Sequence, residues 1–179
     1  MNPPDSDLIA RVLGSDDRNA FGELVVRHQS PVRRFLRHLL NGDAATADDL
    51  AQETFIRAYR GLARFRADSS FSTWLMGIAH NQYRNARRRR RETPWEPAEM
   101  PDEGEPGPAK SVELHADMTV AMKKLDPDEQ TALHLFYHQG FTHPDIAFIT
   151  GWPLGTVKTH ISRGKDKLRT LLETWNPQT

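Results

Sequence analysis

The segment that most constrains the fold is residues 92–110, ETPWEPAEMPDEGEPGPAK, near the middle of the chain. Its 19 residues include five Pro, two Gly and six acidic side chains. Pro blocks helix interiors, and so few apolar side chains cannot offset the entropy lost on ordering the segment. We therefore predict a flexible acidic linker between one domain at residues 1–91 and another at residues 111–179.

Apolar side chains in the first part of the chain recur at helical spacing. Residues 20–40 and 47–62 each place them on one stripe, with a bend or restart expected at Pro31 and an N-cap at Thr46. No run of period-two alternation, which would indicate a strand, occurs in the sequence. The pattern predicts an all-α fold.

Two further stretches have the same helical pattern. Residues 72–90 predict a helix capped by Ser72 or Thr73, and residues 112–125 predict a short amphipathic helix. Together with the linker, they predict two small helical domains.

The start of the next helix is marked by Asp126-Pro127-Asp128-Glu129, because Asp at the N-cap, Pro at the first position and Glu at the third form a capping box. Leu133, Phe136 and Tyr137 are predicted to form the buried face of this helix, and Gly140 to end it.

Residues 142–169 have the spacing of a helix-turn-helix. Ala147 is the small residue where the two helices meet, Gly151 suits a turn that needs positive φ, and Val157 anchors the second helix. Side chains that donate hydrogen bonds face outward on the second helix and can reach base edges and phosphates: Lys158, Thr159, Ser162, Arg163 and Lys165. A helical hairpin with a solvated basic face is the alternative.

Charge is segregated along the chain, although the 24 basic and 24 acidic side chains cancel. Residues 57–91 hold 10 basic side chains and one acidic, whereas residues 92–129 hold three basic and 11 acidic. Within residues 64–91 the arginines alternate with Phe65, Phe71, Trp74 and Tyr83. Aromatic faces can stack on unpaired bases while arginines follow the backbone, which favours melted or single-stranded DNA. Burial of Phe71 and Trp74 in the core is the alternative.

An acidic, partly apolar stripe lies on the predicted exposed side of residues 47–62. It contains Asp49, Gln52, Glu53 and Ile56. Such a stripe repels phosphates and suits a protein partner, although an ordinary solvated face has the same composition.

Several classes of site are not predicted. The chain has no Cys, which excludes disulfides and Cys-ligated metals, and it contains no glycine-rich phosphate loop or other catalytic motif. His134 and His138, with His143 nearby, have a spacing that could ligate a metal, but we predict two surface histidines instead. We expect no enzyme activity, no cofactor and no metal.

The N-terminal residues are acidic and lack an apolar core, and no stretch reaches the ~18 apolar residues of a membrane span. We therefore expect a soluble, cytoplasmic protein.

These motifs together resemble bacterial sigma factors of the extracytoplasmic-function type, which are members of the sigma-70 family. DDLAQETFIRAYRGLARFRADSSFSTWLMGIAHNQYRNARRRRR resembles their second region, and FTHPDIAFITGWPLGTVKTHISRGKDKLR resembles their fourth. The resemblance implies a transcription initiation factor that binds core RNA polymerase and directs it to promoters. It further implies that Asp49, Gln52, Glu53 and Ile56 dock on the polymerase clamp helices.

The resemblance also assigns DNA contacts. The loop at residues 65–72 would capture a base flipped from the −10 element, with the following helix contacting the same element and its upstream edge. The −10 residues implied are Phe65, Arg66, Asp68, Ser69, Ser70, Phe71, Trp74, Asn81, Arg84, Asn85, Arg87 and Arg88. The −35 residues implied are Thr156, Lys158, Thr159, His160, Ser162, Arg163, Lys165 and Lys167. Of these, Thr156, Lys165 and Lys167 suit phosphates.

The principal alternative is a stand-alone helix-turn-helix regulator that binds duplex DNA as a dimer. Such a regulator needs neither the acidic stripe nor the aromatic and arginine-rich segment. A regulatory partner, such as an anti-sigma factor, is plausible because both domains expose functional faces, but no residue identifies it.

Overall fold

The computed structural model describes residues 3–92, 118 and 120–175, and within these residues it contains helices and no strand. The predicted all-α class is confirmed. The chain divides into two compact units, and each has its own buried apolar side chains. Apart from Glu92, the predicted linker at residues 92–110 lies outside the described residues, so its flexibility stays a prediction.

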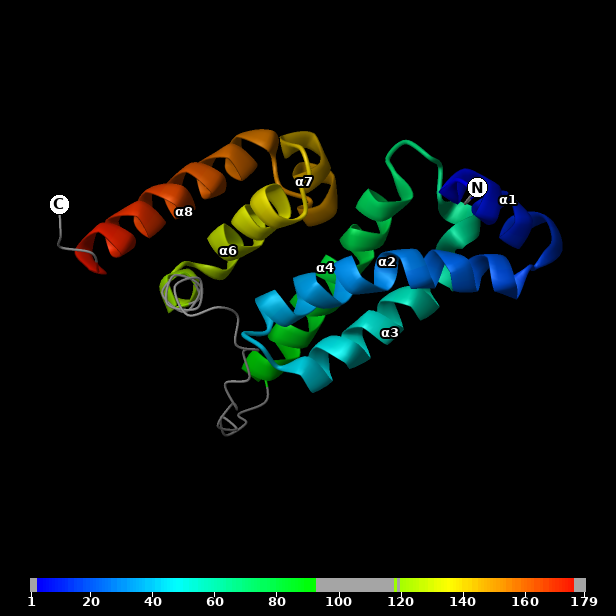
Figure 1. Cartoon of the computed structure of the whole chain (residues 1–179), viewed down its shortest axis with the longest axis horizontal. Helices are drawn as coiled ribbons and strands as arrows, with labels where there is room; N and C mark the ends of the chain where they lie inside the picture. The colour runs from blue at the N-terminus through cyan, green and yellow to red at the C-terminus, as the bar shows by residue number, and fades with distance from the viewer. Residues whose placement is uncertain (1–2, 93–117, 119, 176–179) are drawn as a thin grey trace, which may run out of the picture. The chain divides into compact units, whose positions relative to one another are not determined.

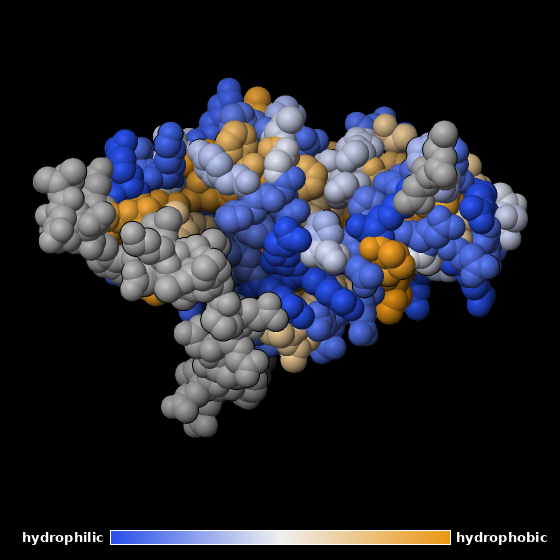
Figure 2. Space-filling model, viewed as in Figure 1, coloured by the Kyte–Doolittle hydropathy of each residue, from blue (hydrophilic) through white to orange (hydrophobic). Residues whose placement is uncertain are grey.

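The helices of the first unit pack around α2, which contacts α1, α3 and α4 (Figure 1). Their bounds are α1 Asp5–Ser15, α2 Arg18–Leu39, α3 Ala44–Gly61, the short 3₁₀ helix η1 Leu62–Arg64, and α4 Phe71–Glu92. Leu24, Phe35 and Leu36 of α2 are fully buried. Burial of each such side chain stabilises the folded state by about 1.5–3 kcal/mol. Hydrophilic side chains cover most of the face seen in Figure 2, as expected for helices whose apolar stripes point inward.

Helix α1 was not predicted from the sequence. Leu8, Ile9 and Val12 bury one side of it, and Asp5 and Asp7 stand in its first turn, where negative charge favours the helix dipole. The apolar spacing i, i+1, i+4 was the available signal, but it spans little more than one turn.

Helix α3 begins earlier than predicted, because Asp43 and not Thr46 is its N-cap. The Asp43 carboxylate accepts a hydrogen bond from the backbone nitrogen of Thr46 at 3.0 Å. Helix α2 continues through Pro31 without the restart that was expected. The buried side chains Val32 and Phe35, directly after Pro31, offset the backbone hydrogen bond that proline cannot make.

Helix α4 also begins one residue earlier than predicted, and its cap is Ser70. The Ser70 hydroxyl oxygen accepts a hydrogen bond from the backbone nitrogen of Thr73 at 3.0 Å. The predicted caps Ser72 and Thr73 therefore lie inside the first turn.

The second unit contains α6, η2, α8 and the part of α7 up to Ala147. The bounds are α6 Pro127–Leu133, the π-helical turn η2 His134–His138, α7 His143–Thr150, and α8 Leu154–Trp175. Capping boxes at Asp126 and Thr142 begin α6 and α7, and the first of them confirms the predicted start at Asp126. The predicted helix at 112–125 falls largely outside the described residues, although residues 120–123 are helical.

The π-helical turn changes which side chains of its segment are buried. A π turn holds one more residue than an α turn, so the side chains within it rotate away from their α-helical directions. Phe136 is half-buried and Tyr137 is 58% exposed, although both were predicted to be buried. His134 and Leu135 are buried in their place, so the expectation of a surface His134 was wrong.

Helix α8 packs on α6 at Gly164, which is buried. A Cβ atom at this position would lie 2.8 Å from Leu133 Cδ1 and 3.4 Å from Glu129 Cβ. Carbon atoms in contact are about 3.5–4.0 Å apart. The absence of a side chain at Gly164 therefore permits the close approach of the two helices.

Candidate nucleic-acid interface

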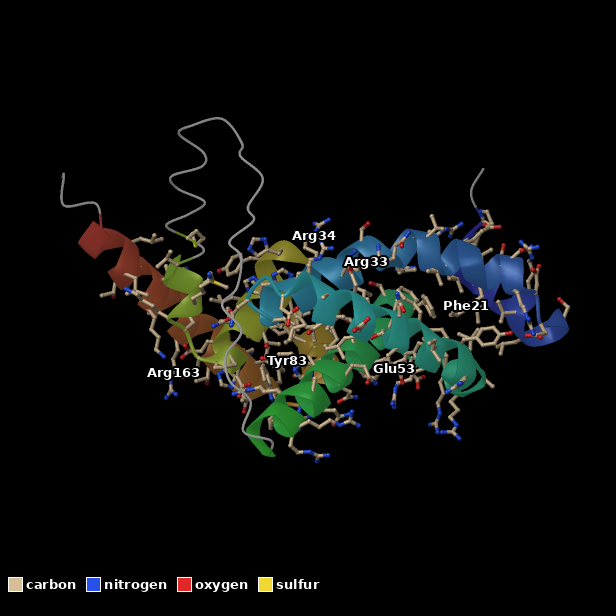
Figure 3. The ribbon with its side chains drawn as sticks, turned by 90° about the horizontal axis from the view of Figure 1, so that it is seen from below. Phe21, Arg33, Arg34, Glu53, Tyr83 and Arg163 are labelled. Carbon is tan, nitrogen blue, oxygen red and sulfur yellow. The ribbon has the colours of Figure 1, made fainter. Side chains whose placement is uncertain are left out.

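The outer face of α3 carries the predicted acidic stripe. Asp49, Gln52 and Ile56 are exposed, and Glu53 is half-buried with its Oε1 atom 2.5 Å from Arg57 Nε. Figure 3 shows Glu53 on α3, with its side chain directed away from α2. The four predicted residues therefore share one accessible face of a single helix.

The neighbouring Asp48 has different surroundings from Asp49. Its Oδ1 atom lies 3.5 Å from Arg33 Nε and 3.5 Å from Arg37 Nη2, both on α2. Asp48 thus joins α2 to α3, whereas the exposed Asp49 is available to a partner.

A shallow groove beside this stripe was not predicted from the sequence. It is lined by apolar and aromatic side chains and by two arginines: Phe21, Phe55, Ile56, Tyr59, Arg18 and Arg60. The rings of Phe21 and Tyr59 meet edge-on with centroids 4.9 Å apart. The Tyr59 hydroxyl donates a hydrogen bond to the Asp16 carboxylate, which raises the pKa of Tyr59. Helical spacing places Phe21, Phe55 and Tyr59 on apolar stripes, but it does not distinguish a groove from the core.

The loop between η1 and α4 is bracketed by an aromatic cluster of Phe65, Phe71 and Trp74. The ring centroids are 5.9 Å apart for Phe65 and Phe71, 5.3 Å for Phe65 and Trp74, and 5.8 Å for Phe71 and Trp74. Phe71 is 4% exposed, which agrees with the core alternative for this residue, and Phe65 and Trp74 are half-buried. The cluster therefore fixes both ends of the loop.

Polar side chains occupy the loop itself. Arg66, Asp68 and Ser70 are exposed, Ser69 is half-buried, and Ala67 has a φ of 58°, in the left-handed region. The loop displays charged and hydroxyl groups on a backbone that turns sharply.

Helix α4 continues from this loop with a polar face. Asn81, Arg84, Asn85 and Arg88 are exposed, and Arg87 is half-buried. The four exposed residues stand at i, i+3, i+4 and i+7 and therefore share one side of the helix. Amide and guanidinium groups at this spacing can contact both bases and phosphates.

The helix-turn-helix of the second unit has the predicted turn. Gly151 has a φ of 75°, and its backbone nitrogen donates to the Ala147 carbonyl at 2.9 Å. Val157 and Ile161 are buried on α8. The outward residues of α8 are Lys158, Thr159, Ser162, Arg163 and Lys165, all exposed. Figure 3 shows Arg163 directed away from the α8 ribbon.

Three predicted −35 residues have other interactions or are partly covered. Thr156 and His160 are half-buried, and the His160 ring packs against Trp152 with centroids 4.7 Å apart. The ammonium group of Lys167 lies 2.9 Å from both Asp126 Oδ2 and Glu129 Oε2. A phosphate contact by Lys167 stays a prediction, and it would compete with these carboxylates.

The histidines of η2 and α7 pack against aromatic rings. His134 stacks on His138, and His143 stacks on Phe136, each pair with ring centroids 5.0 Å apart. Among the residues that the structure describes, no group of three or more His, Asp or Glu side chains is placed to hold a metal ion. None of the helices in the described part of the chain has the length and apolar character needed to cross a membrane.

Comparison with protein families matches both units. The model for sigma-70 region 2 matches residues 24–93, and the model for sigma-70 region 4 matches residues 115–168. The first match contains the acidic stripe, the loop and the polar face of α4, and the second contains the helix-turn-helix.

Curated relatives cover most of the chain. The RNA polymerase sigma-H factor of Pseudomonas aeruginosa is 35% identical, over 94% of this chain and 94% of its own length. The ECF RNA polymerase sigma-E factor of Salmonella typhimurium is 34% identical, over 92% of each chain.

Two solved structures of protein complexes contain a chain of similar fold. CnrH in complex with the cytosolic domain of CnrY has a TM-score of 0.71 and 27% identity, over 95% of this chain and 97% of that chain. The sigma factor RpoE of Bartonella quintana, in complex with the anti-sigma factor NepR, has a TM-score of 0.68 and 26% identity, over 86% of this chain and 96% of that chain.

These matches favour the initiation factor over the stand-alone regulator, because the region 2 match accounts for the surfaces that a simple regulator does not need. Sigma factors in general are non-enzymatic initiation factors that bind core RNA polymerase and promoter DNA. The chain belongs to the sigma-70 family, as a sigma factor of the extracytoplasmic-function type that directs RNA polymerase to promoters.

Proposed function

We propose that this sigma factor divides promoter recognition among three surfaces. The outer face of α3 docks on the polymerase clamp helices. The loop at residues 65–70 and the polar face of α4 engage the −10 element, and α8 reads the −35 element. The observation that carries this proposal is the separation of charge among exposed side chains. The α3 stripe is acidic, whereas the exposed faces of α4 and α8 carry arginines, lysines and amides.

The α3 stripe suits a protein partner with basic side chains. Asp49, Gln52 and Glu53 supply charge and hydrogen-bond acceptors, and Ile56, 45% exposed, supplies apolar area. Charged groups at an interface rim steer association, and a desolvated apolar centre gives affinity. The adjoining groove lined by Phe21 and Tyr59 extends the apolar part of this surface.

The loop and α4 suit a melted −10 element. Extrusion of a base from the duplex costs a few kcal/mol, which contacts with the extruded base and the phosphates must offset. The exposed polar groups of Arg66, Asp68 and Ser70 can contact such a base, and Arg84 and Arg88 can contact phosphates. Buried Phe71 contributes by supporting the loop.

Helix α8 suits the major groove of the −35 element. Its outward side chains include Lys158 and Arg163, which can bind guanine edges, together with the hydroxyl groups of Thr159 and Ser162. Buried Val157 and Ile161 hold the opposite side of the helix against its unit.

Regulation by a protein partner and a cytoplasmic location complete the proposal. The structural neighbour RpoE of Bartonella quintana is bound to an anti-sigma factor, which supports an inhibitor of the same kind for this chain. RNA polymerase acts in the cytoplasm of bacteria, so its sigma factor acts there too. A linker at residues 92–110 with the flexibility that its sequence predicts would let the domains at 1–91 and 111–179 reach separate promoter elements.

The test is run-off transcription with purified core RNA polymerase on a library of randomised promoters. We expect selected promoters to share two sequence elements at a fixed spacing, and transcription to depend on the added chain. Binding to palindromic duplexes without polymerase, and no stimulation of transcription, would contradict the proposal.

A further inference from the structure

The first residues of α1 are held on α2 by a carboxylate. Asp5 Oδ1 lies 3.0 Å from Arg27 Nη1, and Asp5 Oδ2 lies 2.8 Å from His28 Nε2. Arg27 Nη1 also donates a hydrogen bond to the Pro3 carbonyl oxygen at 2.6 Å. The Asp5 side chain is 30% exposed and that of His28 is 15% exposed, so the pair is partly withdrawn from water.

The same histidine contacts the start of α4. The His28 ring meets the Phe71 ring edge-on, with centroids 5.2 Å apart and an interplanar angle of 68°. A carboxylate bound to one ring nitrogen fixes the orientation of an imidazole. Asp5 therefore sets the plane of the ring on which Phe71 packs.

Phe71 transmits this constraint to the loop, because it belongs to the aromatic cluster with Phe65 and Trp74. Phe65 immediately precedes the exposed loop residues, and Phe71 immediately follows them. A shift of Phe71 would move both ends of the loop relative to each other.

We propose that Asp5 and His28 are positioning residues for the loop at 66–70, through which α1 contributes to −10 recognition without contacting DNA. The inference rests on the proposed function of the loop in binding a base of the −10 element. An ordered loop binds its ligand more tightly because less conformational entropy is lost on binding. Loss of the pair would loosen the loop and weaken discrimination among −10 sequences.

The experiment compares Asp5→Ala, His28→Ala and the double variant with the wild-type chain, each assembled with core polymerase. Run-off transcription is measured on a library-selected promoter and on versions with single −10 substitutions. Arg11→Ala is the matched control, because it breaks the ion pair between Arg11 of α1 and Asp17, the N-cap of α2, and leaves Asp5, His28 and the loop unchanged.

We expect each single variant to lower the ratio of transcription between selected and substituted promoters about three- to tenfold, the effect of releasing one or two ordered side chains. The double variant should lower the ratio by less than the product of the two single effects, because both substitutions remove the contact between Asp5 and His28. A defect that only reduced the amount of folded protein would lower transcription from all promoters and leave this ratio unchanged.

An unchanged ratio in Asp5→Ala and His28→Ala, or an equal loss in Arg11→Ala, would overturn the inference. The loop variant Asp68→Ala separates this result from a failure of the proposed function. If Asp68→Ala lowers the ratio and the pair variants do not, the loop reads DNA without help from α1. If neither Asp68→Ala nor the pair variants change the ratio, the proposed role of the loop is wrong, and so is the inference that rests on it.

Discussion

The ammonium nitrogen of Lys167 on α8 lies 2.9 Å from Glu129 Oε2 on α6, and the Glu129 side chain is 4% exposed. The same nitrogen lies 2.9 Å from Asp126 Oδ2, at the N-cap of α6. A nearly buried carboxylate that loses its cation is costly, because water cannot replace the lost partner. Lys167 therefore holds the helix-turn-helix unit together as well as standing on the predicted DNA-binding helix.

Lys167→Ala should lower the melting temperature of the chain at pH 7, because it leaves Glu129 without its cation. Lys165→Ala removes an exposed lysine of the same helix and should have little effect. Thermal denaturation followed by circular dichroism measures both. Equal melting temperatures for the two variants would show that the contact adds no stability.

The stabilisation by Lys167 should vary with pH in a defined direction. The hydrogen bonds that Lys167 donates to Glu129 and, second, to Asp126 raise the pKa of Lys167 above 10.5, and the same hydrogen bond lowers the pKa of Asp126 below 3.8. The contribution of Lys167 to folding stability is complete below pH 10.5 and is lost as the pH rises through the raised pKa of this lysine. The Asp126 contribution is complete above pH 3.8 and is lost as the pH falls through the lowered value. The difference in melting temperature between wild type and Lys167→Ala should therefore be largest between these limits.

Gly164→Ala should destabilise the second unit, because the added Cβ would meet Leu133 Cδ1 at 2.8 Å. Overpacking lowers the free energy of unfolding by about 1–3 kcal/mol, and the higher helix propensity of Ala raises it by up to about 1 kcal/mol. Gly155→Ala on the same helix meets no atom within 4 Å and should stabilise the chain. Denaturant unfolding of both variants gives the comparison, and a stabilised Gly164→Ala would contradict the tight packing of α8 on α6.

Charge reversal at the α3 stripe should abolish capture of core polymerase without unfolding the chain. Asp49→Lys combined with Glu53→Lys changes accessible groups and should eliminate co-purification. Asp48→Asn should instead leave capture intact and cost up to about 1 kcal/mol of stability, since Asp48 pairs with Arg33 and Arg37. Loss of polymerase capture in Asp48→Asn, or normal capture by the double variant, would show that the α3 stripe is not the polymerase contact.

Arg163→Ala should weaken binding to the −35 element by about 1–3 kcal/mol if its guanidinium group reads a base. The measurement is holoenzyme affinity for the selected promoter and for one with a scrambled −35 element. A base contact lowers affinity mainly for the selected sequence, whereas a phosphate contact lowers both equally. Equal affinity of the variant and the wild type for each promoter would remove Arg163 from the interface.

Periodicity predicted the long helices α2, α3, α4 and α8 well, because their apolar stripes extend over several turns, whereas it missed the shorter α1. The inward Leu24 and Phe35 on α2, and the outward Lys158 and Arg163 on α8, lie where their spacing indicated. Helix starts were less predictable, since Asp, Ser and Thr are frequent near them and any of these can cap. Asp43 is the cap of α3 because its carboxylate accepts a hydrogen bond from the backbone nitrogen of Thr46, three residues later.

The relationships that spacing could not predict join residues far apart in sequence or depend on backbone geometry. The contact of His28 with Asp5 arises from the packing of α1 on α2. The exposure of Tyr137 follows from a π turn, which the residue types alone do not specify. The contact of His28 with Asp5 and the exposure of Tyr137 are therefore visible only in the structure.

That π turn has a consequence for how the length of this helix can vary. A single residue inserted into an α-helix is accommodated by one wide turn, which leaves the flanking residues in phase with their neighbours. Deleting one residue within His134–His138 would convert the wide turn into an ordinary one while Leu133 keeps its place under Gly164. This segment is therefore a point where the chain can gain or lose a residue and the contact of α6 with α8 is preserved.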